Sequence, residues 1–152
     1  GHSAQEAVRS LLNTLASKHS SGAQLTAVRG AIATHFAHNS VADIIASLAS
    51  ETDTTIQDWC QETIATLKSR SPLAMATTLE MLRRAQELSL ADCFRLEFHL
   101  GSQWFSKGDF MEGVRALIID KDKNPRWQPA TIEALEQAQV DEFFAGFQAH
   151  GA

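Results

Sequence analysis

The chain has 152 residues, 44% of them hydrophobic and only three of them proline, which is typical of one globular domain with a core rather than of a disordered protein. Its formal net charge of −5 argues against broad nucleic-acid binding, which usually needs a basic face. No apolar run approaches the roughly 20 residues of a membrane span, so we expect neither nucleic acid nor a membrane as a partner.

Apolar residues recur at helical spacing through the first third of the chain. These residues form three stripes: Val8, Leu11, Leu12 and Leu15; Leu25, Val28, Ile32 and Phe36; and Val41, Ile44, Ile45 and Leu48. Before the first stripe, Gly1-His2 resembles the remnant of an expression tag, and no signal peptide follows. The polar stretch 18–22 separates the first two. Ser40 precedes the third and has Asp43 three residues later, an arrangement similar to a capping box. We expect three helices, each buried along one face.

The middle of the chain predicts three further helices. Their inward faces are formed by Ile56, Trp59, Cys60, Ile64 and Leu67, by Leu73, Ala76, Leu79 and Leu82, and by Cys93, Phe94, Glu97, Leu100 and Trp104. Ser71-Pro72 is a strong start signal, because serine can cap free amides and proline at the first helical position costs no hydrogen bond. Ser89, with Asp92 three residues on, begins the longest helix, and Lys107-Gly108 ends it.

Asp109 and Glu112 form the clearest capping box of the chain, in the pattern D-x-x-E. In such a box each side chain accepts a hydrogen bond from the backbone amide of the other residue. Arg115 follows on the next turn, where we expect it to pair with a neighbouring carboxylate such as Glu97. We interpret these four residues as structural.

The C-terminal part predicts an apolar helix face at Phe110, Val114, Leu117 and Ile118, followed by irregular chain. The stretch 120–129 is charged and contains two prolines, which forbid a continuing helix. A short helix near 131–137 and a last one carrying Phe143, Phe144 and Phe147 close the chain. Since no segment shows the alternating pattern of a strand, the sequence predicts an all-α fold.

Side chains that could carry chemistry are few. His35 and His38 lie three residues apart, but zinc sites need three or four ligands and no third one follows at a recognisable spacing, so we assign no metal and no cofactor. Cys93 and His99 lie six residues apart on one helix and do not meet well, and we expect Cys60 and Cys93 to be free thiols. The chain has neither a glycine-rich phosphate loop nor a GxSxG elbow, and we assign no catalytic residue.

Glu97 stands out because it lies among apolar neighbours, including Phe94 and Phe98. A carboxylate in such surroundings needs a partner or shifts its pKa. The available cations are Arg83, Arg95 and Arg115. An ion pair between packed helices is favoured over a catalytic role, because structural ion pairs also perturb pKa values.

The stretch 109–127 reads DFMEGVRALIIDKDKNPRW and resembles the C-terminal signature of the 3-hydroxyisobutyryl-CoA hydrolase family, part of the crotonase (enoyl-CoA hydratase/isomerase) superfamily. Upstream, SPLAMATTL from Ser71 and LSLADCFRLEF from Leu88 resemble two further motifs of that family. They depart from it at Ala74, where serine is usual, and at Phe98, where tyrosine is common. The region 32–45 is similar to the short helices before them, so the resemblance covers roughly residues 30–144.

The resemblance implies the helical C-terminal region of a crotonase-like protein, with about seven to nine helices. We expect a helical segment, 1–70, and a region carrying the signature, 71–152, to form one structural unit. Family members have an N-terminal core that binds the CoA thioester and supplies the catalytic carboxylates and the oxyanion-hole amides. That core is missing here, so the resemblance assigns no catalytic residue, and we expect the chain to be inactive alone.

By the same resemblance, the segment around Leu117 to Lys121 is similar to the place where some relatives touch the adenine end of CoA. Lys121 or Arg126 could then meet a phosphate as a charge-assisted donor. The alternative is a solvated basic patch that Asp120 and Asp122 balance.

The first function hypothesis is the C-terminal part of an acyl-CoA thioester hydrolase of valine breakdown, with acyl-CoA as substrate and the N-terminal core as partner. The alternative is a non-catalytic, crotonase-like structural or interaction subunit, for example of a mitochondrial ribosome. We expect the mitochondrial matrix as the location in a eukaryote and the cytoplasm in a bacterium. Apolar surface that the missing core would cover predicts a homo-oligomer.

Overall fold

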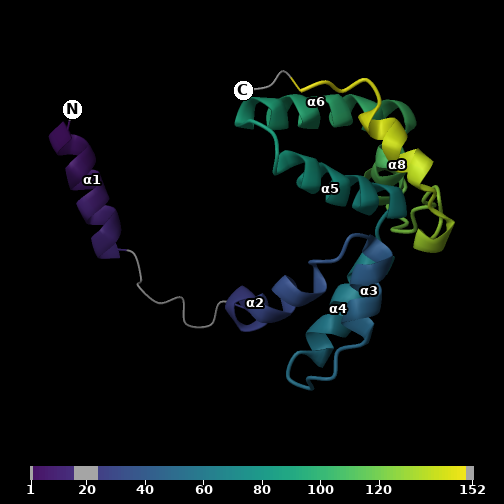
Figure 1. Ribbon diagram of the computed structural model, residues 1–152, viewed down its shortest axis with the longest axis horizontal. Coiled ribbons are helices and arrows are strands. Elements are labelled where there is room, and N and C mark those ends of the chain that lie inside the picture. Colours follow the sequence, from purple (N-terminus) through teal and green to yellow (C-terminus); the bar gives the residue numbers. More distant parts are fainter. Residues whose placement is uncertain (1, 16–23, 150–152) are drawn as a thin grey trace. The chain divides into compact units, whose positions relative to one another are not determined.

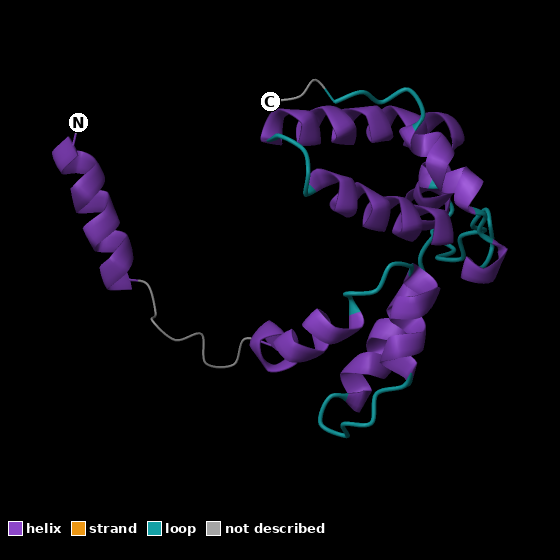
Figure 2. Ribbon diagram, viewed as in Figure 1, coloured by secondary structure: helices purple, strands orange, loops and turns teal. Residues whose placement is uncertain are grey.

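The computed structural model describes residues 2–15 and 24–149 and separates into two compact units, 1–34 and 35–152. Within the described residues the regular elements are eight α-helices, one π-helical turn and one 3-10 turn, and there is no strand (Figures 1 and 2). The predicted all-α class is confirmed. None of the described helices combines the length and the apolar character that crossing a membrane requires.

The first unit contains α1 (His2–Leu15) and most of α2 (Gln24–His35), so both predicted helices are confirmed. The apolar stripe of α1 is exposed rather than buried, because Val8, Leu11 and Leu12 are between 57% and 61% accessible. Periodicity shows which residues share a face, whereas burial also needs a surface to pack against. The polar stretch 18–22 and the side chain of Leu15 lie outside the described residues.

In the second unit, α3 (Val41–Ala49) packs against α4 (Gln57–Lys68). Their shared core consists of Ile44, Leu48, Cys60 and Ile64. The Oγ atom of Ser40 accepts a hydrogen bond from the amide of Asp43 at 3.0 Å, which confirms the predicted N-cap. The two cysteines are free thiols, as the sequence predicts.

A second core joins α5 (Pro72–Ala85), α6 (Leu90–Lys107) and α8 (Gln137–Phe144). Its buried residues are Leu73, Leu96, Leu100, Val140, Phe143 and Phe144. Helix α8 packs against both α5 and α6 (Figure 1). The predicted caps of α5 and α6 are confirmed, because Ser71 and Ser89 each accept a hydrogen bond from the amide three residues on.

Helix α6 buries only part of the face that the sequence indicates, because Leu100 is buried and Trp104 packs against the core, whereas Phe94 and Glu97 are exposed. The buried positions are Asp92, Leu96 and Leu100, four residues apart, whereas Phe94 is 63% exposed. Because α6 is apolar on two sides, its pattern alone does not decide which side meets the core. The exposed apolar side, called the α6 stripe below, consists of Leu90, Phe94, Phe98 and Phe105.

The chain after α6 is less regular than the apolar pattern suggests. Helix α7 (Phe110–Val114) passes directly into a π-helical turn (Arg115–Ile119). A 3-10 turn (Ile132–Ala134) replaces the short helix predicted near 131–137. The segment between these two turns is irregular, as its prolines predict. We call residues 120–127 the Arg115 loop, because the side chain of that arginine binds Asp120, Asp122 and Asn124.

Candidate functional site

Asp109 does not form the predicted capping box with Glu112, because its side chain accepts no hydrogen bond from an amide of α7. Its carboxylate is buried and reaches two distant segments instead. Oδ2 accepts a hydrogen bond from the hydroxyl of Ser71 at 2.5 Å, and Oδ1 accepts one from the amide of Gln128 at 3.0 Å. Asp109 therefore ties the start of α5 to the chain beyond the Arg115 loop.

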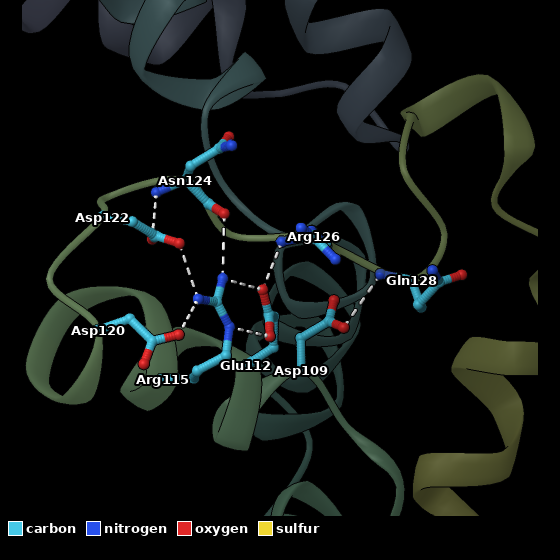
Figure 3. Close-up of polar contacts among 8 residues, drawn as sticks. All are labelled: Asp109, Glu112, Arg115, Asp120, Asp122, Asn124, Arg126 and Gln128. Carbon is cyan, nitrogen blue, oxygen red and sulfur yellow. Dashed lines mark hydrogen bonds and ion pairs between the residues drawn. The ribbon is translucent and has the colours of Figure 1, made fainter.

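The guanidinium of Arg115 binds Glu112 in a bidentate pair, with Nε and Nη2 each 2.8 Å from a carboxylate oxygen (Figure 3). Nη1 donates to Asp120 at 2.6 Å and to Asp122 at 2.8 Å. Nη2 also donates to the backbone carbonyl of Asn124 at 3.1 Å. The planar fork of arginine can bridge such partners at fixed angles, so one side chain joins α7 to three positions of the loop.

These contacts keep the cluster charged at neutral pH. Hydrogen bonds from Arg115, followed by one from the amide of Arg126 at 2.6 Å, lower the pKa of Glu112 to about 2. Arg115, followed by the amide of Asn124, also lowers the pKa of Asp122. The pKa of Arg115 rises in return, because its hydrogen bonds to Glu112 and to the two aspartates favour the charged guanidinium.

The backbone of the loop is also held by hydrogen bonds. The amide of Asp120 donates to the carbonyl of Arg115 at 2.8 Å and closes the π-helical turn, and the amide of Lys123 donates to the carbonyl of Ala116 at 3.0 Å. Lys121 and Lys123 both adopt the left-handed conformation, with φ values of 56° and 54°. Residues other than glycine rarely adopt it unless their surroundings hold them there.

Lys121 and Arg126, the predicted contacts for a CoA phosphate, lie on this loop with exposed side chains. In the alternative interpretation Asp120 and Asp122 balance their charge. Both aspartates instead direct a carboxylate oxygen at Arg115. The structure therefore brings the two predicted residues onto one loop, while their contact with CoA stays a prediction.

Glu97 is not the buried, ion-paired carboxylate that the sequence indicates. Its side chain is exposed on α6, where water solvates the charge. The expected cations Arg83, Arg95 and Arg115 instead bind Asn39, Asp92 and the carboxylates around the Arg115 loop. Glu97 is exposed because the helical register of α6 turns its side chain away from the core.

A largely apolar groove of about 790 Å³ runs beside the loop. It is lined mainly by Trp104, Phe110, Val114, Leu117, Pro125 and Trp127, and its polar members include the Ser71–Asp109 pair, Arg70 and Lys123. Sequence reasoning missed both the groove and Lys123, because the walls come from segments that are far apart in the chain. The P-x-W motif at 125–127 was the only local signal for it.

The ring of His35 forms hydrogen bonds within the second unit. Nδ1 lies 2.8 Å from Oγ of Ser47, and Nε2 lies 2.9 Å from Oε2 of Glu51, so both ring nitrogens have hydrogen-bond partners. His38 is exposed. Among the described residues, no group of three or more histidine, cysteine or acidic side chains could hold a metal ion.

Comparison with known proteins places this arrangement in a family. The model of the enoyl-CoA hydratase/isomerase family matches residues 1–144. The mitochondrial 3-hydroxyisobutyryl-CoA hydrolase of Dictyostelium discoideum is 39% identical over 110 residues, which are 72% of this chain and 28% of that protein. The small ribosomal subunit protein mS47 of Arabidopsis thaliana is 33% identical over 113 residues, again 72% of this chain and 28% of that protein. The chain spans less than a third of the length of either relative.

Solved structures agree with the sequence comparison. An enoyl-CoA hydratase from Rhodobacter sphaeroides 2.4.1 matches with a TM-score of 0.74 and 29% identity, over 93% of this chain and 42% of that chain. A carnitinyl-CoA dehydratase from Mycobacterium thermoresistibile matches with a TM-score of 0.70 and 33% identity, over 80% of this chain and 34% of that chain. These matches confirm the resemblance drawn from the sequence motifs, and the chain belongs to the enoyl-CoA hydratase/isomerase family of the crotonase superfamily.

Proposed function

We propose that the chain is the C-terminal helical part of an acyl-CoA thioester hydrolase that acts on 3-hydroxyisobutyryl-CoA in valine breakdown. The observation that carries the proposal is the 39% identity to the Dictyostelium 3-hydroxyisobutyryl-CoA hydrolase, over a segment that includes less than a third of that enzyme. The remaining length of such an enzyme would contain the catalytic carboxylates and the oxyanion-hole amides. This chain would help to bind the CoA ester and would support the catalytic part of the enzyme.

Within that function, Lys121 and Arg126 would contact a phosphate of CoA. Both side chains are exposed and belong to one loop, and the two aspartates beside Lys121 bind Arg115. A phosphate oxygen accepts strong, charge-assisted hydrogen bonds from lysine and arginine. Acyl-CoA is the substrate in this proposal, and no resident cofactor is needed.

The proposal is tested with the longer protein that contains this chain. Its purified form should hydrolyse 3-hydroxyisobutyryl-CoA, followed by the release of free thiol, and Lys121→Gln should raise the KM for that ester. A longer protein that binds no CoA ester would contradict the proposal. Its reading frame should also encode two carboxylates close to a glycine-rich oxyanion loop.

A second candidate is a non-catalytic structural subunit, which the 33% identity to the ribosomal protein mS47 favours. Such a subunit needs the fold but not the catalytic groups. Co-sedimentation of the longer protein with the small ribosomal subunit, without thioester hydrolysis, would support this candidate. Hydrolysis without co-sedimentation would support the first.

Partners and location follow from the same proposal. The exposed apolar surface would be covered first by the preceding part of the longer protein. A second copy of the protein would be a further partner. Relatives named as mitochondrial favour the mitochondrial matrix if the source is a eukaryote, and a bacterial protein would be cytoplasmic. Cell fractionation of the source organism tests this.

A further inference from the structure

Lys121 lies between two acidic residues that do not neutralise it. Asp120 and Asp122 each direct Oδ2 at Nη1 of Arg115, at 2.6 and 2.8 Å (Figure 3). The second oxygen of Asp122 accepts a hydrogen bond from the amide of Asn124 at 2.9 Å. In the part of the chain that the structure describes, Lys121 forms no ion pair. Its ammonium therefore stays available to an anion from outside the chain.

The backbone of Lys121 needs an external constraint. With φ at 56°, the residue occupies the left-handed region, where Cβ is crowded against the chain. Such states persist where the surroundings determine them, and they are frequent at sites of function. The constraint is visible on both sides of the residue, because Arg115 holds its preceding and its following neighbour.

Hydrogen bonds that involve Arg115 or its partner Glu112 also reach the rest of the loop. Glu112 accepts hydrogen bonds from Arg115 and also from the amide of Arg126, the latter at 2.6 Å. Arg115 also donates to the carbonyl of Asn124. By contrast, the amide of Gln128 is bound by Asp109, which has no contact with the guanidinium in Figure 3. Arg115 thus organises the loop as far as residue 126, whereas a different carboxylate fixes the backbone at Gln128.

We infer that Arg115 is a positioning residue: it binds the acidic residues on both sides of Lys121, holds that lysine in the left-handed conformation, and so aims its ammonium at a phosphate oxygen of acyl-CoA. The inference rests on the proposed function in one respect, the identity of the anion. The organisation of the loop by Arg115 rests on the contacts alone. The two parts are therefore tested separately.

The first test is amide hydrogen exchange on the 152-residue chain with Arg115→Gln. Loss of charge-assisted hydrogen bonds should speed exchange at the amides of Asn124 and Arg126 by about tenfold or more, while Gln128 keeps its protection. Arg29→Gln, at an exposed arginine of α2, is the control for loss of one positive charge and should change none of these rates. Unchanged exchange at Asn124 and Arg126 would overturn the inference.

Arg115→Lys guards against a general effect on folding. A single ammonium keeps the charge but cannot form the bidentate pair with Glu112 and reach both aspartates together. We expect exchange at Asn124 and Arg126 to be intermediate in this variant, with the core amides of α6 unchanged. Protection as complete as in the wild type would show that charge alone holds the loop and would contradict a positioning role.

The second test is a double-mutant cycle in the longer protein, with 3-hydroxyisobutyryl-CoA as substrate. If Arg115 acts through Lys121, then Lys121→Gln, Arg115→Gln and the double variant should each raise KM by about tenfold, with kcat nearly unchanged. A purely structural role would give additive effects, which would overturn the inference. An unchanged KM in Lys121→Gln would instead contradict the proposed CoA contact, while the exchange result would still stand for the loop.

Discussion

Asp109 and Glu112 lie one helical turn apart and serve different parts of the molecule. Asp109 is buried and binds Ser71 and the amide of Gln128, which are distant in sequence. Glu112 binds Arg115 on its own turn and the amide of Arg126 across the loop. The D-x-x-E pattern predicts a capping box, which the two residues do not form. The hydrogen bonds differ from the expected ones, because all four partners lie outside α7.

Glu112 makes the stability of the chain depend on pH in acid solution. Its pKa is about 2 when folded, below the roughly 4.3 of a free glutamate, so the unfolded state binds more protons between these values. The stabilising contribution is therefore complete above about pH 4.5 and is lost as the pH falls towards 2. We expect the difference in urea midpoint between wild type and Glu112→Gln to shrink over that range. A difference that stays constant from pH 7 to pH 2 would contradict this role.

Asp109 should matter to stability because it is buried. Asp109→Ala leaves the hydroxyl of Ser71 and the amide of Gln128 without their acceptor, and an unsatisfied buried donor costs about 1 to 3 kcal/mol. We expect a clear fall in the free energy of unfolding, measured by urea denaturation. Asp141→Ala, at an exposed position of α8, is the matched control and should change it little. Equal and small effects in the two variants would show that the buried contacts of Asp109 do not contribute to the free energy of unfolding.

At the scale of the helices, the serine cap signals were reliable, whereas the capping box at Asp109 and the long-range features were not. The caps at Ser40, Ser71 and Ser89 were predictable, because a cap depends on residues within three positions. The buried face of α6 was predicted only in part, because that helix is apolar on two sides and the elements packed against it decide which side is buried. The π-helical turn after α7 was missed as well, since apolar spacing does not distinguish it from an α-helix.

The two sides of α6 give a direct test of its register. Leu96 is 1% exposed, and truncating such a core leucine to alanine costs about 2 to 5 kcal/mol. Phe98 lies two positions further and is 83% exposed, so Phe98→Ala should leave the melting temperature of dilute protein almost unchanged. Thermal unfolding of the two variants decides the matter. A larger loss in Phe98→Ala than in Leu96→Ala would place the core on the opposite side of α6.

At the scale of the whole molecule, the fold class and the family could be predicted and the site only in part. The motifs in 71–127 identify the family because they keep the order and spacing of its residues. Lys121 and Arg126 were found through that resemblance, whereas the contacts of Arg115 with Glu112 and with three loop residues were not. These contacts depend on how the loop folds back towards α7, and no local sequence pattern predicts that fold of the backbone.

The chain alone should hydrolyse no acyl-CoA. The acidic residue that sequence reasoning considered for chemistry, Glu97, is exposed on α6, and the clustered carboxylates near the loop are bound to Arg115. A thioester assay on the purified 152-residue chain should therefore match the buffer blank. Turnover well above the blank that disappears in Glu97→Gln would make Glu97 catalytic and reverse this interpretation.

The exposed apolar surface predicts self-association of the isolated chain. The α6 stripe carries Phe94 and Phe98 at 63% and 83% exposure. The rings of Phe105 and Phe110 contact each other in a tilted arrangement with centroids 4.7 Å apart, so the apolar surface continues onto α7. Large exposed apolar patches usually mark contact sites. We expect light scattering to give a mass above 16.6 kDa that rises with concentration. Phe94→Ser combined with Phe98→Ser should lower that mass, whereas Leu25→Ser, at a 72% exposed leucine of α2, serves as a control outside the stripe. A strictly monomeric wild type at high concentration would show that water covers the α6 stripe in the isolated chain.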